Sequence, residues 1–250
     1  MIEGQGCKST KKVLQHRDYL RLLRYKRYHG KPYDLTISIP PMEPMSIDFL
    51  IFPLVEELDV IGPFEVFGKL KDVSENHGNL RILAPAEVTV CKHGLRILRT
   101  TFLDSENCGS ILVVPGGKGT REPSEERSAV IDYIRATHTA YKIILSVCTG
   151  TFLLDEAGIL RNKVCTTHTR FQKELKQKGY SVVHNRVVHD GKVITSTGVT
   201  SGIDASLYVV AFMCGKALTE QVIHRIEYPF SADEILEMVH VVPTDDQEML

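Results

Sequence analysis

One cysteine stands where a nucleophile is expected. An apolar run over residues 143–147 leads directly into Cys148 and Thr149, and Gly150 and a helical pattern follow. A strand that turns sharply into a helix resembles a nucleophile elbow, which holds a reactive side chain above the edge of a sheet. The helix N-terminus would lower the pKa of Cys148, and the Thr149 N–H would stabilise a developing anion. Four other cysteines are interpreted as packing residues: Cys91, Cys108, Cys165 and Cys214.

A carboxylate in another loop is the predicted proton carrier. Asp59 lies among the apolar residues 58–61, just after the first apolar run, where partial burial would let it hold or deliver a proton. Glu56 and Glu57 are interpreted as partners of the helix start. Glu65 comes nearly two turns later and is less able to reach the same spot.

A third loop carries paired glycines. The run Val113-Val114-Pro115 ends in Gly116 and Gly117, whose backbone can approach a ligand closely. Their N–H groups would complete an oxyanion-binding pair with Thr149. The spacing matches neither the P-loop nor the dinucleotide fingerprint, so we do not expect a nucleotide. No Cys/His spacing suits zinc, and we expect neither a metal nor an organic cofactor.

Alternating short apolar runs and helical segments would position these loops. They predict an α/β fold in which a mostly parallel sheet carries helices on both faces, and the loops at the carboxyl ends of its strands converge. The clearest strands are expected at 47–52, 80–83, 111–114 and 143–147. Hairpins are expected at 88–101 and at 182–197, and one helix over 201–217. With 43% hydrophobic residues and a net charge of −1, the composition excludes collagen-like, disordered and coiled-coil proteins. The longest apolar run, 205–215, is too short to cross a membrane.

The first residues differ from the rest. Residues 1–32 contain nine Lys or Arg against Glu3 and Asp18, a segmental charge of +7. A transit peptide or a nucleic-acid-binding arm is one interpretation, and a solvated tail is the one we favour. We therefore expect a disordered extension over 1–45, one domain over 46–217, and a tail over 218–250 that packs on the domain or trails it. The start lacks the apolar core of a secretory signal, which predicts a cytoplasmic protein with reduced thiols.

Five motifs together resemble the ThiJ/PfpI superfamily, within the class I glutamine amidotransferase-like (flavodoxin-like) fold. They are Leu58-Asp59-x-x-Gly62-Pro63, Val114-Pro115-Gly116-Gly117, Ser146-Val147-Cys148-Thr149-Gly150, Thr166-Thr167-His168 and Thr197-Gly198-Val199-Thr200-Ser201-Gly202-Ile203-Asp204. The resemblance covers about residues 46–217 and implies a homodimer that acts on a small molecule. It implies that Thr200 and Asp204 line the far side of the pocket and that His168 borders it. With about thirty residues after Ala217, we expect no DNA-binding helix pair, and so no nucleic-acid partner.

Within the superfamily, the Leu-Asp-x-x-Gly-Pro and Cys-Thr-Gly forms are similar to those of isonitrile hydratases and of the sensor domains of AraC-type regulators, which a DNA-binding helix pair follows. The resemblance implies that Cys148 adds to an isonitrile carbon while Asp59 supplies a proton, and that water then releases an N-substituted formamide. A glutathione-independent glyoxalase or deglycase is the alternative, although such members usually place His where Thr149 stands here. A redox sensor or chaperone with an oxidisable Cys148, and a relative without activity, are the others.

Overall fold

A computed structural model describes residues 45–74 and 77–243, all of which belong to one compact unit. The predicted basic extension, except for Met45, lies outside this range. Among the helices of the described part, none has the length and apolar character needed to cross a membrane.

A seven-stranded sheet forms the centre of the described unit, in the order β11-β9-β10-β6-β5-β1-β2. All neighbouring pairs are parallel except β9 and β10, which form an antiparallel hairpin. The central strands β5 and β6 are buried at every residue, because helices cover both faces. The strands are β1 Met45–Leu50, β2 His77–Leu83, β5 Ile111–Val114, β6 Ile143–Val147, β9 Val187–Asp190, β10 Val193–Ser196 and β11 Val239–Val241.

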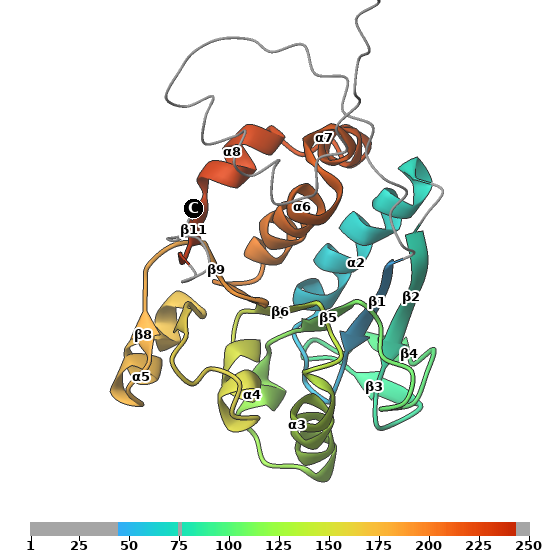
Figure 1. The fold of residues 1–250 in the computed structure, drawn as a ribbon. Coiled ribbons are helices and arrows are strands. Elements are labelled where there is room, and N and C mark those ends of the chain that lie inside the picture. Colours follow the sequence, from blue (N-terminus) through green and yellow to red (C-terminus); the bar gives the residue numbers. More distant parts are fainter. Residues whose placement is uncertain (1–44, 75–76, 244–250) are drawn as a thin grey trace, which may run out of the picture. The chain divides into compact units, whose positions relative to one another are not determined.

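Helices lie on both faces of this sheet, as Figure 1 shows. One face carries α2, α6, α7 and α8, and the other carries α3 and α4. The helices are α2 Glu57–Val73, α3 Glu125–Thr137, α4 Gly150–Glu156, α5 Gln172–Gln177, α6 Ser201–Cys214, α7 Lys216–Arg225 and α8 Ala232–Glu237, with 3-10 turns at Lys118–Thr120 and Thr169–Phe171. The predicted α/β fold with a mostly parallel sheet is therefore confirmed.

Two short sheets stand beside the main one. The hairpin of β3 (Val88–Val90) and β4 (Arg96–Leu98) was predicted from the sequence. The pair of β7 (Val164–Cys165) and β8 (Ser181–Val182) was not predicted. Val182 belongs to β8 and not to the second expected hairpin, which β9 and β10 form.

The chain after α6 is folded. The sequence predicted one helix over 201–217, but α6 ends at Cys214 because Gly215 has a φ of 85°. This positive φ favours glycine and does not continue a helix. The next helix, α7, starts at once, and β11 then pairs with β9 at the edge of the sheet.

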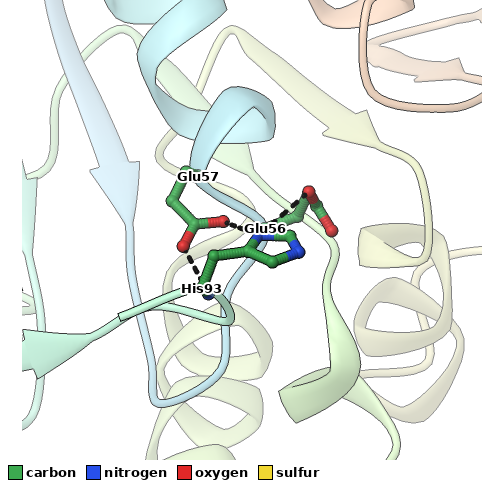
Figure 2. A group of neighbouring side chains, drawn as sticks. All are labelled: Glu56, Glu57 and His93. Atoms are coloured by element: carbon green, nitrogen blue, oxygen red, sulfur yellow. Dashed lines mark hydrogen bonds and ion pairs between the residues drawn. The ribbon is translucent and has the colours of Figure 1, made fainter. Parts of the chain in front are cut away.

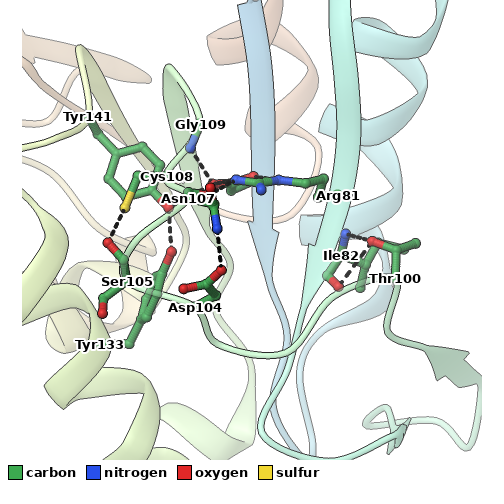
Figure 3. Close-up of polar contacts among 11 residues, drawn as sticks. Arg81, Ile82, Thr100, Asp104, Ser105, Asn107, Cys108, Gly109, Tyr133 and Tyr141 are labelled. Atoms are coloured by element: carbon green, nitrogen blue, oxygen red, sulfur yellow. Dashed lines mark hydrogen bonds and ion pairs between the residues drawn. The ribbon is translucent and has the colours of Figure 1, made fainter.

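A buried carboxylate of β1 joins several of these elements. Asp48 in β1 is fully buried, and Arg81, Gly109 and Tyr141, labelled in Figure 3, all donate to it. Arg81 Nε lies 2.7 Å from Oδ1, while Arg81 Nη2, Gly109 N and Tyr141 OH lie 2.7–2.8 Å from Oδ2. Tyr133 extends the network through a 2.6 Å hydrogen bond to Tyr141. Four hydrogen bonds offset much of the cost of burying this charge.

Candidate active site

Cys148 occupies a strained turn between β6 and α4, as the sequence predicted. Its φ is 57°, a left-handed conformation that is unusual for a residue with a side chain. The Cys148 N–H donates to Ser196 O at 3.2 Å, and Thr167 Oγ1 donates to Cys148 O at 2.8 Å. Gly150 allows α4 to begin here, since a Cβ at this position would lie 2.2 Å from Val114 O. The turn holds the thiol at the carboxyl end of the sheet.

Asp59 reaches the same place from the first crossover. It is the third residue of α2, is fully buried, and accepts the Gly116 N–H at Oδ2 over 2.9 Å. Its carboxyl group also interacts with the Cys148 thiol. Its Oδ1 is buried and has no hydrogen-bond partner in the described part of the chain. Burial raises the pKa of Asp59 to about 7, against the lowering effect of the Gly116 N–H. Asp59 can therefore both hold and release a proton near neutral pH.

The thiol is less acidic than the sequence suggested. Burial first, and then the negative charge of Asp59, raise the pKa of Cys148 to about 12. The N–H of Thr149 opposes this shift but does not outweigh it. The prediction that the helix N-terminus would lower this pKa is therefore wrong, since Cys148 is only 6% exposed and stands beside a carboxylate. The thiol needs a base at the moment it attacks.

The paired glycines organise the site through their N–H groups. Gly116 N donates to Asp59, and Gly117 N donates to Thr149 Oγ1 at 3.0 Å. Neither N–H is thus free to face a ligand in the way the sequence analysis expected. A side chain at Gly116 would come within 2.6 Å of Thr149 N, and Gly117 has a φ of 124°. Both positions therefore require glycine. Their N–H groups hold the side chains of Asp59 and Thr149 beside the thiol.

A cavity of about 540 Å³ opens above Cys148 and Thr149. Phe171, His168 and Val199 form part of its wall, and charged side chains stand around it. The lining residues are Glu56, Lys92, Gly117, Lys118, Arg121, Glu122, Cys148, Thr149, His168, Arg170, Phe171 and Val199. A small molecule can thus reach the thiol.

A cluster of two glutamates and a histidine fixes the β3–β4 hairpin beside this cavity. Figure 2 shows Glu56, Glu57 and His93 turned toward one another. One carboxylate oxygen of each glutamate and one ring nitrogen of His93 lie within 4.8 Å of one another, which is close enough to hold a metal ion. His93 donates its backbone N–H to Glu57 over 2.6 Å, and its ring Nδ1 lies 2.8 Å from the same carboxylate. Lys92 Nζ lies 2.7 Å from Glu56 Oε2. Glu56 is already paired with the positive charge of Lys92, so we assign the cluster to anchoring the hairpin and not to binding a metal ion. The hairpin places Lys92 in the cavity wall.

Other predicted residues fall in different places. His168 lines the cavity, as the resemblance implied, and accepts the Arg170 N–H at Nδ1 over 3.2 Å. Thr200 and Asp204 are not among its lining residues, so that expectation is corrected. Both side chains bind Arg186 instead, which donates to Thr200 Oγ1 at 2.9 Å and to Asp204 Oδ2 at 2.6 Å.

Glu65 behaves as predicted and stays away from the site. It is exposed, and its carboxylate lies 3.3 Å from Lys69 one turn later on α2. No feature of the sequence predicted the cationic residues that line the cavity. Their loops carry no motif that predicts where they meet.

The fold and the buried Cys–Asp pair define a class of α/β proteins with a cysteine at a nucleophile elbow. The model of the DJ-1/PfpI family matches residues 45–211, and the chain belongs to this family. The resemblance inferred from the sequence is thereby confirmed. The chain is 34% identical over 184 residues to the isonitrile hydratase of Pseudomonas putida, covering 74% of this chain and 78% of that protein.

More distant relatives share the same domain. The glutathione-independent glyoxalase DJR-1.2 of Caenorhabditis elegans is 25% identical over 173 residues, which cover 67% of this chain and 88% of the glyoxalase. Among solved structures, a ThiJ/PfpI family protein from Pseudomonas syringae superimposes with a TM-score of 0.65 at 26% identity. That match covers 82% of this chain and 84% of the other.

Proposed function

We propose that this protein hydrates isonitriles to N-substituted formamides through a covalent adduct on Cys148. The observation that carries the proposal is the Cys–Asp pair, in which Cys148 lines the cavity, while the fully buried Asp59 beside it has a pKa raised to about 7 and interacts with the thiol. The similarity to an isonitrile hydratase over most of both chains supports the same reaction.

The first step joins the thiol to the substrate. The pKa of Cys148 is raised to about 12, so the thiol keeps its proton until it reacts. Asp59, as a carboxylate, takes up this proton while sulfur bonds to the terminal isonitrile carbon, and then delivers it to that carbon. The product is a thioimidate in which the carbon carries one hydrogen, one sulfur and a double bond to nitrogen. Asp59 is again a carboxylate.

The second step adds water. Asp59 removes one proton from a water molecule, whose oxygen bonds to the thioimidate carbon, and passes this proton to the nitrogen. The C–S bond then breaks, the proton of the added hydroxyl goes to the Cys148 sulfur, and the carbon becomes the carbonyl of the formamide. Thr149 Oγ1 lies at the cavity floor and both accepts from Gly117 N and donates to Gly117 O, at 3.0 and 3.2 Å. This fixed hydroxyl is suited to orient the water or the substrate.

The test offers purified protein phenyl isonitrile and measures formamide by liquid chromatography. We expect turnover, and a loss of about a hundredfold or more in Cys148→Ala and in Asp59→Asn, the usual contribution of positioned acid–base groups. Glu65→Gln is the matched control, since it removes a carboxylate of the same helix that faces solvent.

Methylglyoxal is offered in parallel, because the domain is similar to a glyoxalase. Lactate without formamide would refute the proposal in favour of glyoxalase chemistry. Undiminished turnover in either site variant would refute the roles of Cys148 and Asp59.

A further inference from the structure

The cavity above Cys148 is rich in positive charge. Four cationic side chains line it, against two acidic ones. Two of the cations are neutralised inside the cavity: Lys92 pairs with Glu56 and Lys118 pairs with Glu122, both over 2.7 Å. Arg121 is paired with Glu174, which does not line the cavity, over 2.8 Å, and Arg170 provides the remaining charge.

The two arginines share one aromatic wall. The Arg121 guanidinium lies 4.6 Å from the centre of the Phe171 ring and 5.1 Å from that of Phe152. The Arg170 guanidinium lies 5.9 Å from the centre of the Phe171 ring. Stacking on an aromatic face holds a guanidinium in place and leaves the donors at its edge available. Phe171 therefore presents two planar cations at one side of the cavity.

The hydrogen-bonding capacity of these arginines is largely unused. Arg121 Nη2 donates to Glu174 Oε2 at 2.8 Å, which occupies one of its five N–H groups. Within 45–74 and 77–243, the Arg170 guanidinium has no carboxylate partner, and the residue is exposed. A planar carboxylate is the ligand that a guanidinium binds through two parallel hydrogen bonds.

We propose that the substrate is an isonitrile that carries a carboxylate, and that Arg170, with Arg121, binds this carboxylate while the isonitrile carbon reaches Cys148. The inference rests on the proposed function and specifies its substrate class. Phe171 and Val199 lie in the wall of the same cavity and would contact the apolar part of the molecule. An acidic substrate would also be drawn toward the excess positive charge.

The test compares 4-isocyanobenzoate with its methyl ester, which has nearly the same shape but no charge. We expect kcat/KM to be about tenfold higher for the carboxylate, in line with a charge-assisted hydrogen bond. Arg170→Gln should remove this preference by raising KM for the carboxylate, with kcat unchanged and the ester unaffected. Arg170→Lys should restore only part of it, since lysine lacks the planar fork.

Lys173→Gln is the control, because Lys173 is an exposed cation of the neighbouring helix α5 that does not line the cavity. It removes the same charge and should leave the preference intact. Equal kcat/KM for acid and ester, or an equal loss in Lys173→Gln and Arg170→Gln, would overturn the carboxylate site while hydration itself stands.

A binding measurement separates this inference from the proposed function. Titration of Cys148→Ala with 4-formamidobenzoate in a calorimeter needs no turnover. We expect binding that weakens about tenfold when Arg170→Gln is added. Binding of this kind without any isonitrile turnover would refute the hydratase proposal and keep the carboxylate site. Binding that does not depend on Arg170 would overturn the site.

Discussion

Replacing Asp59 by asparagine should remove a specific pH dependence of stability. Asn has nearly the shape of Asp, and its side-chain oxygen can still accept the Gly116 N–H that now reaches Oδ2 over 2.9 Å. The side chain is fully buried, so solvent screens its charge little. The substitution therefore removes one titration and leaves the packing of α2 nearly unchanged.

The size of the effect follows from the pKa of Asp59, which burial raises from 3.8 to about 7. A carboxyl group with a raised pKa in the folded state stabilises most below its unfolded value, and this contribution is lost as the pH rises to the folded value. Between pH 5 and 7 the folded protein keeps a proton that the unfolded chain has released. The free energy of unfolding should fall by about 1.4 kcal/mol per pH unit, or about 2–3 kcal/mol over this interval.

The assay is urea unfolding of the parent protein and of Asp59→Asn at pH 5 and pH 8. Other titrating groups are common to both proteins, so the difference between the two pH-dependent changes isolates Asp59. We expect the parent to lose about 2–3 kcal/mol more than the variant. Glu65→Gln should follow the parent, because this acid is exposed. Parallel pH curves for the parent and Asp59→Asn would refute the assignment of a raised pKa.

Four further substitutions test the fold and the site. Asp48→Ala leaves Arg81 beside an emptied, buried position, so urea unfolding should show a loss of about 3–5 kcal/mol, and a loss below about 1 kcal/mol would contradict the network. Gly150→Ala should lose about 1–3 kcal/mol as well as activity, because its Cβ would lie 2.2 Å from Val114 O. Gly68→Ala inside α2 is its control and should gain about 0.5–1 kcal/mol, since the added Cβ would lie 3.9 Å from Leu80 Cδ1, an ordinary van der Waals contact. Glu65→Gln should turn over isonitrile within about twofold of the parent, as its ion pair with Lys69 is on the surface, and a larger loss would place Glu65 in the mechanism.

The sequence predicted the centre of the fold well and its margins poorly. Strands at 111–114 and 143–147 have the expected bounds, because both are apolar throughout and stand in the middle of the sheet. The two-residue strands β7 and β8 have no periodicity that a sequence could reveal. The edge strand β11 is also short, and its pairing with β9 is decided by tertiary contacts.

The site could be predicted where it follows from topology. Asp59, Gly116 and Cys148 come after three adjacent strands, β1, β5 and β6, so parallel pairing alone brings them together. The pKa of Cys148 could not be predicted, because it depends on the burial of one sulfur atom. The cationic cavity wall could not be predicted either, because Arg121 and Arg170 are brought together by their contacts with the Phe171 ring.

The parallel strand at Val239–Val241 has a consequence for self-association. It gives β9 a partner along its outer side, and the Val242 N–H continues the ladder to His189 O at 2.9 Å. Without it, β9 would present unpaired backbone groups to any passing polypeptide, a template for intermolecular β-pairing. A chain shortened to Glu237 should therefore aggregate before it loses its catalytic centre, because Val239–Val241 covers a sheet edge that could otherwise pair with other chains.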